Sequence, residues 1–315
     1  MTERDIVALA GGVGAARFLR GLVHVVEPSR LVVVGNTGDD LVRHGLHVSP
    51  DLDTVVYTLG GGIHPEQGWG RADERFTVAT ELAERYGRSD WFTLGDRDLA
   101  THLVRNDVLR AGGTLAQATA EIARAWGLEF RLLPMTDDPV ETRITTTDGR
   151  DLHFQEWWVG ERAAGEVADV RLEGASRARP APGVLEAIGS ADAVVLCPSN
   201  PVVSLGTILS VPGISEALRD APVVGVSPIV GGQVVRGMAD RLLPAVGRET
   251  SASAVAEMYA DLLDAWVLDH ADALLAERVE ALGVRVAVTD TIMRDRDTTA
   301  ALARVALDQL AEERA

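Results

Sequence analysis

Short apolar runs that end at small or polar residues recur along this chain, and helical patterns separate them. Five of these runs have the length of a β-strand: residues 5–9, 31–34, 193–197, 223–226 and 284–289. Such an alternation is typical of parallel α/β architecture. It predicts an α/β fold with a Rossmann-like, mostly parallel sheet and helices on both of its faces. In open sheets of this kind, ligands bind beyond the carboxyl ends of the strands.

The middle of the chain breaks this alternation. Residues 60–127 have a mostly helical pattern, and residues 142–159 alternate as antiparallel strands do, with a hairpin at Asp148-Gly149. A further helical pattern extends from Ser251 to Trp266, and the last one follows Thr298. The sequence thus predicts a helical and β-hairpin subdomain inserted into the Rossmann-like core.

The length of 315 residues is enough for one large domain or two small ones. We expect a single α/β domain over residues 1–315. Both ends of the chain, residues 1–60 and 165–315, would form the Rossmann-like core. Residues 61–164 would form the inserted subdomain.

Charge and cysteine content narrow the classes of partner. The formal net charge is −17, and all 30 basic residues are arginines, so nucleic acids would be repelled on average. The single cysteine, Cys197, allows no internal disulfide and is expected to be a small buried hydrophobe. No apolar stretch approaches the ~20 residues of a membrane span, and the N-terminus does not resemble a signal peptide. We expect a cytoplasmic protein that binds neither nucleic acid nor membrane.

A glycine-rich turn, Gly11-Gly12-Val13-Gly14, follows the first predicted strand and begins a helix. Glycines allow close backbone approach, and a helix N-terminus offers free N–H groups to a phosphate. A tight turn without a ligand is the alternative. The third glycine of the dinucleotide fingerprint is absent, and Gly35-Asn36 stands where its ribose-binding acid would be, which disfavours a nicotinamide dehydrogenase. A chain without lysine also cannot contain a Walker A loop.

Four aspartates, Asp39, Asp40, Asp51 and Asp53, lie within fifteen residues next to this turn. Carboxylate oxygens at a strand end suit Mg²⁺, which usually takes one or two carboxylates together with substrate phosphates. Asp39 and Asp53 are the candidate metal ligands. Alternatively, Asp51 caps a helix that begins near Leu52, and Asp40 is a solvated turn residue.

Three further segments each allow two interpretations. The cluster Asp96-Arg97-Asp98 is either functional or a structural ion pair. The adjacent Trp157 and Trp158 either stack on a flat ring or fill the core. Ser199-Asn200 and Ser227, at two predicted strand ends, either bind a nucleotide or form plain turns.

Taken together and in this order, these blocks resemble the 2-phospho-L-lactate transferase family, over nearly the whole chain. The most specific pieces are Pro50-Asp51-Leu52-Asp53-Thr54, Gly68-Trp69-Gly70, Gly95-Asp96-Arg97-Asp98 with Ala100-Thr101-His102, Met135-Thr136-Asp137-Asp138-Pro139, His153-Phe154-Gln155 and Pro198-Ser199-Asn200-Pro201. Six such blocks at similar spacing make the resemblance specific.

The resemblance implies that the ribityl hydroxyl of the deazaflavin Fo attacks the acid-bearing phosphorus of a guanosine-diphosphate-linked donor. GMP would leave, dehydro coenzyme F-420-0 would form, and Mg²⁺ would be required. Gly68-Trp69-Gly70 and residues 153–158 resemble the actinobacterial members of the family, and this resemblance favours an enolpyruvyl over a lactyl donor. The resemblance also implies that the core binds the donor and that the inserted subdomain binds the acceptor. Members of the family are often homodimers, so a homodimer is expected here.

The resemblance and the residues together suggest a role for each candidate. The glycines Gly11, Gly12 and Gly14 would bind the donor phosphates, with Asn36 and Asp51 as further substrate-binding residues, and Asp39 with Asp53 would bind Mg²⁺. Asp53 or Asp96 would orient or deprotonate the acceptor hydroxyl, Arg97 would bind the acceptor or the transferred phosphate, and Ser199, Asn200 and Ser227 would hold the guanosine. A related group of regulators, which bind a uridine sugar nucleotide without transfer chemistry, is the alternative from another class.

Overall fold

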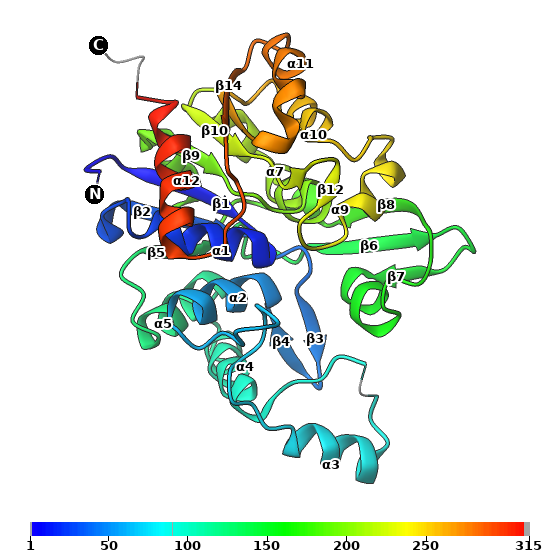
Figure 1. Ribbon diagram of the computed structural model, residues 1–315. Coiled ribbons are helices and arrows are strands. Elements are labelled where there is room, and N and C mark those ends of the chain that lie inside the picture. The colour runs from blue at the N-terminus through cyan, green and yellow to red at the C-terminus, as the bar shows by residue number, and fades with distance from the viewer. Residues whose placement is uncertain (1, 90, 312–315) are drawn as a thin grey trace.

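The computed structural model describes residues 2–89 and 91–311. A seven-stranded sheet with the order β14-β13-β10-β9-β1-β2-β5 lies at its centre, and all neighbouring strands are parallel (Figure 1). The strands are β1 (Ile6–Ala10), β2 (Leu31–Gly35), β5 (Arg131–Pro134), β9 (Ala193–Leu196), β10 (Val223–Val226), β13 (Ala265–Asp269) and β14 (Arg285–Thr289). The predicted Rossmann-like parallel sheet is confirmed.

Helices cover both faces of this sheet, which is why its inner strands are apolar throughout. In β1, Ile6 and Ala8 pack into one hydrophobic cluster, whereas Val7 and Leu9 pack into the other. The first face is covered by α1 (Gly12–Leu22), α2 (Pro50–Leu59), α5 (Leu115–Ala125) and α12 (Arg296–Asp308). The second face is covered by α6 (Val184–Ser190), α7 (Gly206–Leu209), α8 (Ile214–Leu218), α10 (Ala252–Met258) and α11 (Ala276–Glu280).

The remaining elements lie beside the sheet. They are the hairpin β3 (Leu41–Arg43) and β4 (Leu46–Val48), the helices α3 (Thr77–Tyr86), α4 (Asp96–Arg110) and α9 (Ala239–Leu242), the antiparallel strands β6 (Glu141–Thr146), β7 (Asp151–His153) and β8 (Val167–Glu173), and the short pair β11 (Ile229–Val230) and β12 (Gln233–Val234). Ile144 in β6 pairs with Leu152 in β7, so the predicted hairpin at Asp148-Gly149 is present.

The boundaries expected for the insert differ from those in the structure. Strand β5 lies inside residues 61–164, yet it is the edge strand of the central sheet. Strand β8 lies outside those residues, yet it pairs with β6. The helix expected to run to Trp266 ends at Met258, and Trp266 belongs to β13. A short apolar pattern fits a helix or a strand equally well, and here the pairing of β13 with β10 and β14 makes it a strand.

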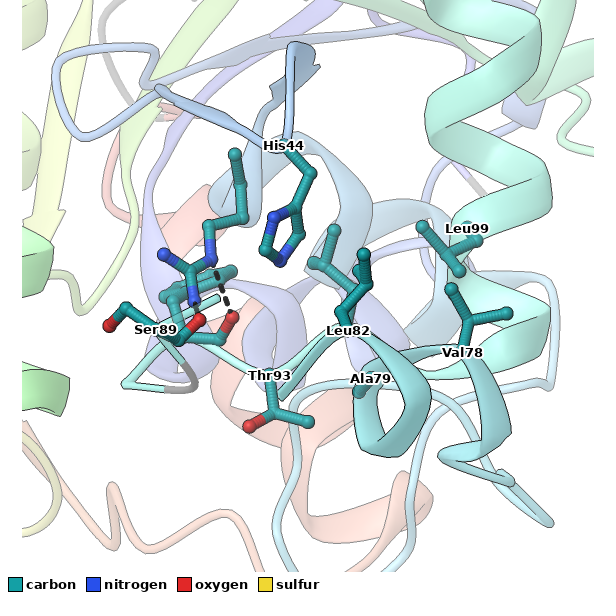
Figure 2. A pocket seen from close by; sticks show the side chains of 10 residues that line it. His44, Val78, Ala79, Leu82, Ser89, Thr93 and Leu99 are labelled. Carbon is teal, nitrogen blue, oxygen red and sulfur yellow. Dashed lines mark hydrogen bonds between the residues drawn. The ribbon is translucent and has the colours of Figure 1, made fainter. Parts of the chain in front are cut away.

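Residues 61–95, between α2 and α4, form a segment that we call the lid. Arg43 at the end of β3 anchors it, because its side chain donates hydrogen bonds to the carbonyl oxygens of Ser89 and of Phe92, the latter over 3.0 Å. Figure 2 shows side chains of the hairpin and of the lid that line a small pocket between them. The volume of this pocket is about 20 Å³, which is room for about one water. Within the described part of the chain, no helix is long and apolar enough to cross a membrane.

Candidate active site

A cavity of about 630 Å³ opens at the carboxyl edge of the central sheet. All five strands predicted from the sequence lead into its wall, which contains Gly11 after β1, Asp39 after β2, Ser199 after β9, Ser227 after β10 and Thr291 after β14. Residues of the lid also line the cavity, together with Phe154, Gln155, Trp158 and Val159. The cavity therefore lies between the core and the segments added to it.

The glycine turn forms one end of the cavity. Gly12 has φ of +71°, and a Cβ on Gly14 would lie 2.3 Å from the carbonyl oxygen of Pro198, so side chains would not fit there. The backbone N–H of Gly11 donates to Ser199 Oγ over 3.1 Å, which ties the turn to the loop after β9. The N-cap residue Gly11 has no side chain to cap α1, and the Gly12 N–H donates to Asp51, so the other N–H groups of the first turn are available to an anionic ligand.

Two buried carboxylates lie next to this turn. Asn36 Nδ2 donates to Asp39 Oδ1 over 2.7 Å and to Asp51 Oδ2 over 2.9 Å, so one amide joins the two side chains. Gln155 Nε2 donates to the other oxygen of Asp39 over 2.8 Å. The sequence motif His153-Phe154-Gln155 thereby gains a structural role, because it fixes the orientation of Asp39 from the side of β7.

The pair carries unbalanced negative charge. Burial raises the pKa of Asp39 well above its ordinary value, and the neighbouring charges of Asp51 and Asp40 add to the rise. Burial likewise raises the pKa of Asp51 to about 6, although hydrogen bonds from Asn36 and the Gly12 backbone oppose it. Two carboxylates held together only by amides favour a bound cation. Among the described residues no group of three or more His, Cys, Asp or Glu could hold a metal, so an ion here would share its shell with ligand oxygens, as Mg²⁺ does.

Asp53 is not part of this pair. It lies two residues after Asp51 on α2, and side chains two apart on a helix point to nearly opposite sides. Both of its oxygens accept hydrogen bonds from the Arg105 guanidinium, with one Nη1–Oδ2 distance of 3.1 Å, and His102 Nδ1 lies 3.7 Å from Oδ2. In this structure Asp53 is neutralised by a buried arginine and is not among the residues of the cavity wall, so the role expected for it as a metal ligand or base stays a prediction.

Asp96 and Arg97 also lie away from the cavity wall. The Asp96 carboxylate accepts the backbone N–H groups of Thr77 over 3.2 Å and Val78 over 3.0 Å, so it caps the first turn of α3. Arg97 is exposed at the start of α4. The expected catalytic roles of both residues are not supported, because these side chains stabilise the lid or face solvent.

The alternative interpretations of Asp40 and Asp51 do not hold either. Asp40 Oδ2 accepts from Ser49 Oγ over 2.6 Å and lies 2.8 Å from His47 Nε2, so Asp40 is not a solvated turn residue. Ser49, not Asp51, occupies the N-cap position of α2.

The polar residues expected to hold a nucleoside do line the cavity. Ser199, Asn200 and Ser227 are all in its wall. Asn200 Oδ1 accepts the backbone N–H of Val202 over 2.9 Å, which fixes this side chain. Their ligand stays a prediction, whereas Cys197 is buried as expected, and burial raises the pKa of its thiol.

The cavity wall also contains six aromatic side chains, and of these only Trp158 belongs to a segment for which the sequence suggested stacking. The six are Trp69, Phe76, Trp91, Phe92, Phe154 and Trp158. The two adjacent tryptophans separate, because Trp158 faces the cavity whereas Trp157 is fully buried and donates from Nε1 to the carbonyl of Gly165 over 3.2 Å. Trp157 therefore fills the core, whereas stacking of Trp158 on a flat ring stays a prediction.

An open glycine turn beside paired carboxylates, at the edge of a parallel sheet, is typical of α/β proteins that bind phosphate esters. Residues 6–306 match the model of the family described as 2-phospho-L-lactate transferase CofD, and the chain belongs to this family of transferases. It is 56% identical over 314 residues to the phosphoenolpyruvate transferase of Streptomyces griseus, covering 98% of both chains.

Other relatives extend this comparison. The phosphoenolpyruvate transferase of Thermobifida fusca is 54% identical, covering 96% of this chain and 97% of that one. The one from Mycolicibacterium smegmatis is 46% identical, covering 96% and 98%. The fold is similar to a crystal structure of a Bacillus halodurans protein of the UPF0052 family, with a TM-score of 0.66, 18% identity, and coverage of 98% of this chain and 99% of that one.

Proposed function

We propose that this protein transfers a phosphoenolpyruvyl group from a guanosine-diphosphate-linked donor to the ribityl hydroxyl of the deazaflavin Fo, giving GMP and dehydro coenzyme F-420-0. Relatives that cover nearly the whole chain are named phosphoenolpyruvate transferases, which supports the transferred group. The structural observation that supports the proposal is one cavity whose wall combines an open glycine turn and two buried carboxylates with several aromatic side chains. The expected homodimer and cytoplasmic location are part of the same proposal.

The donor belongs beside the glycine turn. Its diphosphate would accept hydrogen bonds from the open N–H groups of α1, and Ser199, Asn200 and Ser227 would contact the guanosine. Asp39 and Asp51 would hold Mg²⁺, in place of the expected Asp39 and Asp53. When bound, Mg²⁺ supplies positive charge that offsets the charge developing on the phosphate oxygens.

The acceptor belongs beside the aromatic side chains. Trp69 and Trp158 would stack on a tricyclic ring, and stacking of this kind stabilises a bound base by about 1–3 kcal/mol. Trp91 also lies in the wall, but the Arg43 guanidinium already lies over its ring, 5.2 Å from the centroid. The ribityl chain would then extend from the tricyclic ring toward the carboxylate pair. A ring held in this way fixes the distance between the hydroxyl and the phosphorus, which is the main requirement of phosphoryl transfer.

In the chemical step, the ribityl oxygen forms a bond to phosphorus, and the bond from phosphorus to the GMP oxygen breaks. The proton of the hydroxyl leaves to a carboxylate. Asp39 and Asp51 are the acidic side chains among the described residues of the cavity wall. Among the described residues both oxygens of Asp39 accept hydrogen bonds from side-chain amides, whereas Asp51 accepts one from the Asn36 side chain and one from the Gly12 backbone, and we propose Asp51 as the acceptor of the proton.

Mass spectrometry of the product tests the proposal. The purified protein is incubated with Fo, Mg²⁺ and either the enolpyruvyl or the lactyl diphosphoguanosine, with a matched sample containing a chelator. We expect dehydro coenzyme F-420-0 and GMP from the enolpyruvyl donor, and no product with the chelator. A protein that binds nucleotides without transfer chemistry would form no product with either donor.

A further inference from the structure

Two arginines, Arg17 and Arg236, lie in the wall of the cavity. Arg17 is on α1, three residues after Gly14, and Arg236 follows β12. They are the basic side chains among the wall residues that the structure describes. Within that part of the chain neither of them is ion-paired with a carboxylate, although the chain carries 47 acidic residues.

The two guanidinium groups repel one another. Burial lowers the pKa of Arg17, and the positive charges of Arg236 and Arg20 lower it further. By contrast, the neighbouring charges that raise the pKa of Asp39 are those of Asp51 and Asp40. The cavity thus contains a positive pole and a negative pole that do not neutralise each other. Like charges held together in a partly buried wall become favourable when an anion lies between them.

The lid fixes Arg236 above the helix that carries Arg17. The Arg236 guanidinium donates a hydrogen bond to the carbonyl oxygen of Gln67. Gly68 lies next to this guanidinium, where there is little room for a side chain. A Cβ on Gly68 would lie 3.0 Å from Val13 Cγ1 and 3.2 Å from Arg236 Nη1. One hydrogen bond leaves most of the five guanidinium N–H donors of Arg236 available to a ligand. This contact gives the Gly68-Trp69-Gly70 motif a physical role, since only a small residue lets the lid approach α1 here.

We propose that Arg17 and Arg236 form an anion subsite that binds the carboxylate of the three-carbon acid on the transferred phosphate. The inference rests on the function proposed above, and it adds the residues that select an acid-bearing donor. The diphosphate of that donor already has the amides of α1 and a cation on the Asp39–Asp51 pair as partners. Its carboxylate has no other cationic side chain among the described wall residues. Guanidinium groups bind carboxylates in a bidentate manner, which also orients the phosphorus toward the acceptor.

The test compares a nucleotide with and without the acid. Arg17→Gln, Arg236→Gln and the control Arg20→Gln are purified, and Arg20 is a matched control because it is an exposed arginine on α1 outside the cavity wall. The affinity of each for GDP with Mg²⁺ is measured by calorimetry, and the KM for the enolpyruvyl donor by product formation. We expect Arg17→Gln and Arg236→Gln each to raise that KM about tenfold, with GDP affinity within about twofold of wild type, and Arg20→Gln to change neither.

Two results would overturn the subsite. Equal weakening of GDP and donor would mean that the arginines bind the diphosphate, and unchanged values for both would mean that they contact no part of the donor. If Arg17→Gln unfolds, Arg236→Gln still tests the subsite, because Arg236 is exposed and we expect its replacement to leave the protein folded. Failure of the proposed function is distinct, because wild-type protein itself would then form no product.

Discussion

The two walls of the cavity are built in different ways. Gly11, Asp39 and Ser199 follow buried strands of the central sheet and are themselves buried. On the lid, Trp69 and Phe76 are 53% and 50% exposed, and no residue of α3 is buried. The first wall is therefore held by the core, whereas the second is held by a few polar anchors such as Arg43 and Arg236. We therefore expect the wall at the sheet edge to be rigid and the wall formed by the lid to adjust to a ligand.

Helix α2 repeats the contrast on a smaller scale. Asp51 faces the cavity without a cationic partner, and Asp53 faces the opposite side with Arg105 as its partner. Asp51 therefore belongs to the cavity wall, whereas Asp53, two positions further on, forms a buried ion pair that stabilises the fold. The predictions below separate these roles.

Asp51→Asn should give the largest effect. The amide removes one negative charge from the cation site, so we expect kcat to fall by about 100- to 1,000-fold. The substitution also removes the repulsion between the Asp39 and Asp51 carboxylates, and this repulsion is costly because both groups are buried. The melting temperature should therefore stay the same or rise. Product formation and calorimetric unfolding, measured on the same preparation, check this prediction, and a large loss of stability would contradict it.

Asp53→Asn should affect stability rather than chemistry. Arg105 is 1% exposed and would lose its charged partner, which costs about 3 kcal/mol when a buried pair is broken. Urea unfolding should show this loss, while the folded fraction assayed at low temperature keeps kcat within a fewfold of wild type. If kcat instead fell as far as in Asp51→Asn, the assignment of these two residues would be reversed.

The adjacent tryptophans allow a matched test of the acceptor wall. Trp158→Ala should raise the KM for Fo about tenfold, because one stacking face is lost, and leave the KM for the donor unchanged. Trp157→Ala should instead lower the free energy of unfolding by about 3–5 kcal/mol, since this ring is fully buried. Equal changes in the two KM values for Trp158→Ala would place this side chain elsewhere than in the acceptor site.

Arg97→Gln should give the smallest effect. This side chain is exposed and outside the cavity wall, so we expect kcat and both KM values within about twofold of wild type. Steady-state kinetics at several donor concentrations are sufficient. A loss of tenfold or more would return Arg97 to the site that the sequence suggested for it.

The sequence predicted the sheet well, because parallel strands buried on both faces leave continuous apolar runs such as residues 31–34. It also predicted which strand ends meet, including Asp39 and Ser199, because parallel strands share one carboxyl edge. Trp266 was assigned to a helix, because a short apolar segment fits a helix or a strand until its pairing partners are known.

The site was predicted less completely, for two physical reasons. Helical periodicity alone could have separated Asp51 from Asp53, yet it could not say which of them faces the cavity. The aromatic wall comes from segments far apart in the chain, among them Trp69 and Trp158. Their proximity depends on the fold of the lid, and no local pattern encodes it.

The dependence of nucleotide binding on Mg²⁺ tests the central claim most directly. GDP is titrated into wild-type protein and Asp51→Asn by calorimetry, with and without Mg²⁺. If the Asp39–Asp51 pair holds the cation against the diphosphate, Mg²⁺ will strengthen GDP binding to the wild type at least tenfold and will have little effect on the variant. Equal strengthening by Mg²⁺ in both proteins would show that the cation is held elsewhere and would contradict the account.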